Sequence, residues 1–148
     1  MPHTYTNLLV HIVFSTKERY PFIKPEYEMR LYEYIGGAIR GMKGVCLEIG
    51  GVEDHIHILS KLKPTLNVSR FLESLKPSVT TWARSIIHPK FEWQDGYGAF
   101  SVGESQGPSV RRYIQNQKEH HKKQTFEDEF REMLGNAGIE YDERYLWK

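Results

Sequence analysis

A chain of 148 residues, 39% of them hydrophobic, can bury one compact core but hardly two, so we expect one domain spanning residues 1–148. The only cysteine, Cys46, excludes an internal disulfide and predicts a reducing, cytoplasmic compartment. The apolar run from Leu8 to Phe14 is interrupted by His11 and is far shorter than the ~20 residues that span a bilayer. The sequence therefore predicts a soluble protein without a membrane partner.

The net charge of +1 conceals an uneven distribution of charge along the chain. Residues 60–90 carry a net charge of +5, residues 108–124 carry +4, and residues 125–148 carry −4. Such segregation allows a local basic face that attracts a polyanion although the whole molecule is nearly neutral. For any one of these runs, a solvated helix face is the more ordinary explanation.

The first half of the chain alternates strand and helix patterns. Leu8 to Ser15 predicts a strand that is apolar on both faces. Pro25 to Met42 predicts a helix, because proline suits the first turn and apolar residues recur at helical spacing. Gly44 to Val52 and His55 to Leu62 predict two strands joined tightly around Glu53 and Asp54.

The second half contains more helix. Leu66 to Ile87 has one apolar stripe, and Pro77 is expected to split or kink that helix. Tyr97 to Val102 predicts a fourth strand, and a further helix is expected from about Pro108 to about Gln124. Thr125 and Asp128 have the spacing of a capping box that opens an acidic helix ending at Gly135 or Gly138.

The resulting order, β-α-β-β-α-β followed by extra helices, predicts an α+β fold. It is that of a ferredoxin-like or RRM-like antiparallel sheet with helices packed on one face, extended by a C-terminal helix that bears Tyr113. Because this fold hosts many functions, the site requires its own evidence.

The stretch EDHIHIL at residues 53–59 is the first candidate site. Successive strand residues point to opposite faces, so His55 and His57 share one face while Ile56 and Ile58 share the other. The two imidazoles can then converge on one ion or one phosphate. Histidine pairs of this spacing also arise by chance and stand half-exposed without a ligand, so a partner elsewhere in the sequence is needed.

That partner is predicted in SVRRYIQNQKEHHKKQ, residues 109–124. On a helix, Tyr113 and Gln117 share one face, with His120 and His121 one further turn along and basic residues around them. A phenol and an amide oxygen placed in this way can present a nucleophile and a third metal ligand together. A lone tyrosine on a helix is more commonly a packed amphipathic aromatic.

Four stretches of the sequence closely resemble the single-tyrosine HUH transposases of small bacterial insertion sequences, the IS-two-hundred-like class, and they occur in the same order as in that family. These stretches are FSTKERYPFI, EDHIHIL, WQDGYGAFSVGES and VRRYIQNQKEHHKKQTFEDEF. In that family the histidine pair and a glutamine bind a divalent metal, and the tyrosine one turn before the glutamine attacks DNA. The resemblance implies that His55, His57 and Gln117 are metal ligands and that Tyr113 is the nucleophile.

The resemblance also implies the reaction. The enzyme would cleave and rejoin single-stranded DNA at insertion-sequence ends, recognise DNA hairpins, and pass through a 5′-phosphotyrosine in a bacterial or archaeal cell. On ligand preference alone, two imidazoles and an amide oxygen suit zinc or another transition metal, whereas the resemblance implies Mg²⁺ or Mn²⁺. His11, His120, His121 and Glu53 would support the site from outside or serve only the structure.

Partners follow from the same reasoning. We expect phosphate contacts from five basic residues, which are Lys76, Arg84, Arg111, Arg112 and Lys118. The resemblance implies a homodimer whose active sites are shared between chains. Gly103 and Gly107 in VGESQGPS offer a flexible joint that would let the tyrosine helix reach either histidine pair. An ordinary loop has the same composition.

Other functions remain to be weighed against this one. A non-catalytic module that binds single-stranded nucleic acid would stack bases on Tyr97 and Phe100, but it leaves the tyrosine, glutamine and histidine coincidence unexplained. A histidine-triad hydrolase would need a third histidine where Leu59 stands, and a two-histidine phosphoesterase would need a second H-x-[ST] motif. A host-retained HUH endonuclease would keep the same residues for another task.

Overall fold

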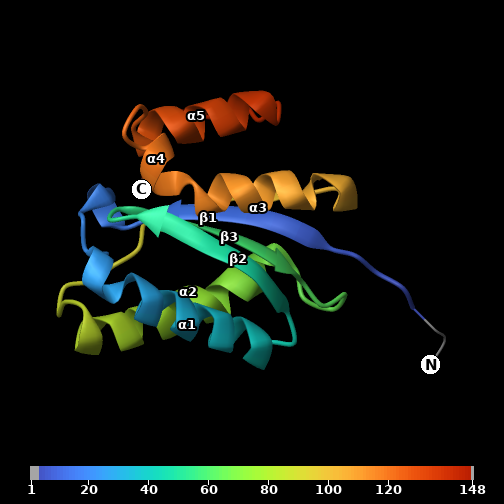
Figure 1. The fold of residues 1–148 in the computed structure, drawn as a ribbon, viewed down its shortest axis with the longest axis horizontal. Helices are drawn as coiled ribbons and strands as arrows, with labels where there is room; N and C mark the ends of the chain where they lie inside the picture. Colours follow the sequence, from blue (N-terminus) through green and yellow to red (C-terminus); the bar gives the residue numbers. More distant parts are fainter. Residues whose placement is uncertain (1–3, 148) are drawn as a thin grey trace.

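The computed structural model describes residues 4–147, in which an antiparallel sheet of four strands carries helices on both faces (Figure 1). The strands are ordered β2-β3-β1-β4. Their bounds are Leu9–Ser15 for β1, Val45–Val52 for β2, His55–Lys61 for β3 and Gly98–Ser101 for β4. This order confirms the predicted ferredoxin-like α+β fold.

The helices divide between the two faces of the sheet (Figure 1). Helices α1 (Pro25–Gly41) and α2 (Val68–Ile86) cover one face. Helices α3 (Gly107–Gln115), α4 (Gln117–His120) and α5 (Phe126–Asn136) lie on the opposite face. Two short 3-10 turns, Lys17–Arg19 and Glu104–Gln106, precede α1 and α3. None of the helices within residues 4–147 combines the length and apolar character that crossing a bilayer requires.

The main apolar core lies between the sheet and the first two helices. Strand β3 contributes Ile56 and Ile58 to it, and β1 contributes Ile12 and Phe14, all of them fully or almost fully buried. Because strand residues alternate, the intervening side chains of β1 and β3 point to the other face. His11, Val13, His55 and His57 therefore share the face that α3 to α5 cover.

Two smaller apolar clusters hold the later helices to that second face. Ile114 of α3 packs with Leu9 and Leu59. Helix α5 packs on Val13 through its apolar stripe, which comprises Phe126, Phe130 and Leu134. Thr125 caps the start of α5, because its side chain accepts a hydrogen bond from the backbone N–H of Asp128, which is one of the two bonds of the predicted capping box.

Two helix predictions need correction. The helix expected from Pro108 to Gln124 ends at Gln115, and Asn116 (φ −98°, ψ 17°) redirects the chain into the short helix α4. This break turns Gln117 into the interior, where it is 1% exposed. Of the two outcomes predicted for Pro77, a split or a kink, the split does not occur: helix α2 runs unbroken from residue 68 to 86, and Leu75 and Val79 anchor it to the core on both sides of the proline.

The tyrosine helix sits so close to β2 that no side chain fits between them. A Cβ atom added to Gly50 would lie 2.4 Å from the backbone oxygen of Ile114 and 2.9 Å from its Cγ2 atom. A Gly50→Ala change should therefore push α3 off the sheet and lower the free energy of unfolding by about 1–3 kcal/mol. Thermal unfolding measures this loss.

Gly135→Ala is the matched control, because in the described structure no heavy atom lies within 4 Å of the Cβ atom it would add within α5. Alanine is the better helix former by roughly 1 kcal/mol, so this variant should keep or gain stability. Equal melting temperatures for the two variants would contradict the close seating of α3.

Candidate active site

A buried carboxylate lies at the centre of the second face. Glu129 of α5 is 1% exposed, and its Oε1 atom lies 3.1 Å from Nε2 of His57 and 3.3 Å from Nε2 of His55. Both histidines are fully buried. The ring of Phe126, one turn earlier in α5, stacks on the His55 ring with centroids 4.4 Å apart. The first turn of α5 therefore closes directly over the histidine pair.

A third imidazole, His121, points its Nε2 atom to the same place, 3.1 Å from Oε1 of Glu129. Each of the three rings is held from behind at Nδ1, which fixes the ring and directs Nε2 inward. The outer partners are Asp54 Oδ1 for His55 (2.8 Å), His11 Nε2 for His57 (2.8 Å) and the backbone oxygen of Gln124 for His121 (2.7 Å).

The predicted tyrosine and glutamine join this cluster. Oε1 of Gln117 lies 3.1 Å from Nε2 of His55 and 2.9 Å from Nε2 of His121, while its amide nitrogen donates to Oε2 of Glu129 at 3.1 Å. The phenol O–H of Tyr113 donates to the same Oε2 atom. The structure thus brings together the four predicted residues, Tyr113, His55, His57 and Gln117, around a carboxylate that was not predicted.

The cluster sets the charges of its members. Burial disfavours the Glu129 carboxylate, yet hydrogen bonds from His121, His55 and His57 hold its pKa far below the usual range. Burial also lowers the pKa of His55, but Asp54 and Glu129 outweigh it and raise the pKa to about 9. Burial lowers the pKa of His57 to about 4, although the hydrogen bond to Glu129 opposes this shift.

The side chain of Tyr113 is the protonated phenol, not the phenolate, in this arrangement. Burial raises its pKa, and the hydrogen bond to the Glu129 carboxylate raises it further, far above the usual range. Burial lowers the pKa of His11 to about 3, so His11 is neutral where its ring contacts His57. The site therefore contains a protonated nucleophile candidate beside an ionised carboxylate.

The donor atoms fit a divalent cation. One ligand atom from each of His55, His57, His121 and Glu129 lies within 4.8 Å of the other three. A metal with bonds of about 2.1 Å keeps its ligand atoms roughly 3–4 Å apart, which matches these separations. Imidazole rings fixed through Nδ1 are the usual form of histidine ligands.

The five predicted DNA-contacting residues divide between the two faces. Lys76 and Arg84 belong to α2; Nζ of Lys76 donates to the backbone oxygens of residues 94–96, and Nε of Arg84 donates to that of Phe91. The other three residues belong to α3 and α4 on the opposite face. Arg111 pairs with Glu48, Lys118 pairs with Glu28, and exposed Arg112 has no partner among the described residues.

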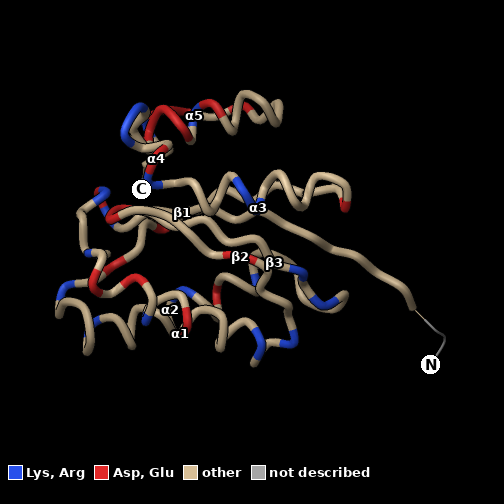
Figure 2. Tube along the Cα trace, in the orientation of Figure 1, with Lys and Arg blue, Asp and Glu red and all other residues tan. Residues whose placement is uncertain are grey.

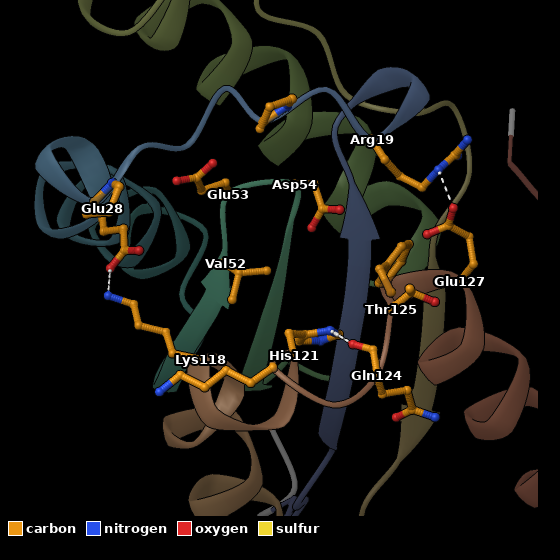
Figure 3. A pocket seen from close by; sticks show the side chains of 14 residues that line it. Arg19, Glu28, Val52, Glu53, Asp54, Lys118, His121, Gln124, Thr125 and Glu127 are labelled. Atoms are coloured by element: carbon orange, nitrogen blue, oxygen red, sulfur yellow. Dashed lines mark hydrogen bonds and ion pairs between the residues drawn. The ribbon is translucent and has the colours of Figure 1, made fainter.

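A pocket of about 580 Å³ opens beside the cluster, where His121 and Asp54 form part of its wall (Figure 3). Arg19 and Glu127 pair at 3.2 Å on another side of the same pocket (Figure 3). Arg19 adopts a left-handed backbone conformation (φ 57°), and its buried Nη1 atom has no hydrogen-bond partner among the described residues. Such strain is often found at functional sites.

Residues 4–117 match the family model described as Transposase IS200 like. The chain belongs to the IS200-like transposases. The matched residues include His55, His57, Tyr113 and Gln117, whereas His121 and Glu129 lie beyond them. No curated protein matches the chain.

Two solved structures share the fold of this transposase. A candidate transposase from Deinococcus radiodurans R1 is 20% identical, with a TM-score of 0.64 over 79% of this chain and 95% of the other. A REP-associated tyrosine transposase bound to a REP hairpin is 15% identical, with a TM-score of 0.61 over 82% of this chain and 73% of the other. At these identities, the likeness is one of fold alone.

Sequence reasoning missed Glu129, and it named His121 and His11 only as residues that would support the site from outside or serve the structure. The signal for Glu129 was present, since it is an acid on the apolar stripe of Phe126, Phe130 and Leu134. His121 follows Gln117 by four residues, a spacing that we took for a continuation of the helix. No local pattern pairs His11 with His57, because the two lie on different strands.

The stability of the metal-free transposase should be greatest near pH 6.5. His55 has a folded pKa of about 9 against an ordinary 6.5, so the stability it contributes is present below pH 6.5 and is lost as the pH rises through 9. His57 and His11 stay neutral in the folded chain while the unfolded chain takes up protons, so stability falls as the pH falls from 6.5 toward 4 and 3.

Melting temperatures measured in a chelator between pH 4 and pH 9 test this expectation. Asp54→Asn removes one of the groups that raise the pKa of His55. The melting temperature of this variant should therefore begin to fall at a pH closer to 6.5 than that of the wild type. A wild-type melting temperature that stays constant from pH 6.5 to pH 9 would disprove the assignment of charge to His55.

Proposed function

We propose that this transposase cleaves and rejoins single-stranded DNA, with Tyr113 as the nucleophile and His55, His57 and Gln117 as ligands of a divalent metal, Mg²⁺ or Mn²⁺. The observation that carries the proposal is the hydrogen bond from the Tyr113 phenol into the buried cluster that contains all three predicted ligands. A packed surface tyrosine would have no need of such a partner.

In the proposed reaction, Oη of Tyr113 attacks the phosphorus of one phosphodiester. A Tyr–O–P bond forms, the bond from phosphorus to the 3′ oxygen breaks, and the 5′ end stays on the tyrosine. The phenol proton leaves along its existing bond to Glu129 and is delivered to the departing 3′ oxygen. A divalent cation, when bound, polarises the phosphate and stabilises the charge that develops on it.

Because one phosphodiester replaces another, the reverse step can join a new strand without ATP. The absence of a GxxxxGK[ST] stretch from the sequence agrees with this scheme. The protein itself positions the phenol, excludes water from the cluster and holds the proton. The burial of the three predicted ligands supports that role.

The DNA strand is proposed to reach the site over α3 and α4. Figure 2 has basic positions in α3 and in the turn after α4, with the acidic first turns of α5 beside that turn. Arg111, Arg112 and Lys118 are exposed there and available for phosphate contacts. The predicted contacts of Lys76 and Arg84 remain proposals, and DNA would have to compete with the backbone oxygens that hold these two side chains.

The substrate and assembly are proposals of the same kind. Hairpins at the ends of an insertion sequence are the proposed substrate, and the similar transposase in complex with a REP hairpin supports this choice. A homodimer with shared active sites and a single domain over residues 1–148 are retained as predictions. So are the cytoplasmic location and the alternatives of a host-retained HUH endonuclease or a non-catalytic binding module.

Tyr113→Phe should abolish cleavage of a single-stranded hairpin substrate and remove the covalent protein–DNA adduct on a denaturing gel, while hairpin binding remains. The reason is that the variant lacks only the attacking oxygen. Tyr20→Phe, which changes an exposed phenol outside the cluster, is the matched control and should retain the adduct. An adduct of normal yield from the Tyr113 variant would identify another nucleophile.

The sharing of active sites can be tested by mixing two inactive proteins, His57→Ala and Tyr113→Phe. If sites are shared between chains, subunit exchange creates one site with an intact histidine pair and an intact tyrosine, and cleavage returns. In the described structure, Tyr113 contacts Glu129 of the same chain. Sharing of the active sites therefore requires α3 to move away from Gly50 of β2, on which it packs. Proven subunit exchange without recovered cleavage would show that each chain completes its own site.

A further inference from the structure

Two donors in the cluster lie outside the three predicted ligands. His121 presents Nε2 at 2.9 Å from the Gln117 oxygen and 3.1 Å from Oε1 of Glu129. Oε1 of Glu129 in turn faces the Nε2 atoms of all three buried histidines. The inward atoms of the two additional residues thus point to the place where the predicted ligands converge.

His121 has the hydrogen bonding of a ligand. A backbone oxygen can only accept, so the bond from Nδ1 to the Gln124 oxygen requires a proton on Nδ1. In a neutral ring, Nε2 then carries a lone pair that is directed at the cluster. The adjacent His120 differs, because its side chain is 29% exposed and packs against Tyr113. Its Nε2 atom lies 3.5 Å from Oε2 of Glu129, the oxygen that accepts from Tyr113, and His120 is not part of the group whose ligand atoms converge.

Glu129 uses its two oxygens for different purposes. Oε1 faces the three imidazoles, while Oε2 accepts hydrogen bonds from Tyr113 and Gln117. A carboxylate oxygen and the lone pair of a neutral Nε2 repel at 3.1 Å unless a proton or a cation lies between them. A metal ion among these atoms removes that repulsion.

On the basis of the proposed function, we infer that His121 and Glu129 are ligands as well, and that the five residues bind a transition-metal ion such as Mn²⁺ in preference to Mg²⁺. Imidazole nitrogens suit transition metals, whereas Mg²⁺ prefers oxygen ligands and retains several waters. Three imidazoles, one carboxylate and one amide oxygen leave little room for those waters. Because Glu129 belongs to α5, the ion would also fasten α5 to the sheet.

Calorimetric titration of the full chain with MnCl₂ and, separately, MgCl₂ tests the inference without DNA. The wild type should bind one Mn²⁺ per chain and bind Mg²⁺ at least roughly tenfold more weakly. His121→Ala and Glu129→Gln should each weaken Mn²⁺ binding by roughly tenfold or more. His120→Ala and Glu127→Gln, the matched controls from the same segments, should keep the wild-type affinity.

Two results would overturn the inference. Unchanged Mn²⁺ affinity in His121→Ala would make that residue structural, and equal or tighter affinity in Glu129→Gln would make the carboxylate a competitor of the ion. If a variant fails to fold, pulsed electron paramagnetic resonance of the wild-type Mn²⁺ complex counts the bound imidazoles, and two in place of three would contradict the ligand set.

The proposed function has a separate readout. If His57→Ala and Gln117→Ala lose Mn²⁺ binding while His121→Ala and Glu129→Gln keep it, the three-ligand proposal stands and the five-ligand set is rejected. Absence of the Tyr113 adduct from wild-type protein that binds Mn²⁺ through all five residues would instead reject the proposed reaction and retain the metal site.

Discussion

The burial of one carboxylate, Glu129, is the constraint on which the rest of this site depends. An ionised carboxylate removed from water costs several kcal/mol unless hydrogen bonds and opposite charge compensate for it. Here the compensation comes from β3, from α3 and from the segment around α4, through His55, His57, Tyr113, Gln117 and His121. Each of these elements must therefore take one position relative to α5. The predicted catalytic groups are brought together because they share this one partner.

Local sequence patterns were sufficient to predict the sheet and half of the candidate site. Alternation along EDHIHIL placed Ile56 and Ile58 in the core and His55 and His57 on the opposite face, which is what the structure contains. The helical spacing of Tyr113 and Gln117 placed them near each other although Asn116 breaks the helix between them. Side chains within a few residues of one another are governed by backbone geometry, so such patterns can be read from sequence.

The unpredicted part consists of contacts between distant segments. Glu129 contacts His57 from 72 residues away in the sequence, and His11 contacts His57 from 46 residues away. The spacing of residues within one helix or strand cannot predict such pairs. Runs of basic residues do not identify a binding face by themselves, because a basic residue can make contacts within the fold as well as contacts with a partner. Lys76 binds three backbone oxygens and lies 4.9 Å from the centre of the Phe14 ring, so a part of the basic run is already used by the chain itself.

The order of the segments along the chain has a consequence for biosynthesis. All four strands and both helices of the main core precede residue 102, whereas the helices that cover the histidine face begin at residue 107. Chains are made from the N-terminus, and early segments fold first. A nascent chain can therefore form its sheet and main core while the histidines are still open to water. Glu129 is the last member of the cluster to be made, so the scaffold can emerge from the ribosome before the reactive centre is enclosed.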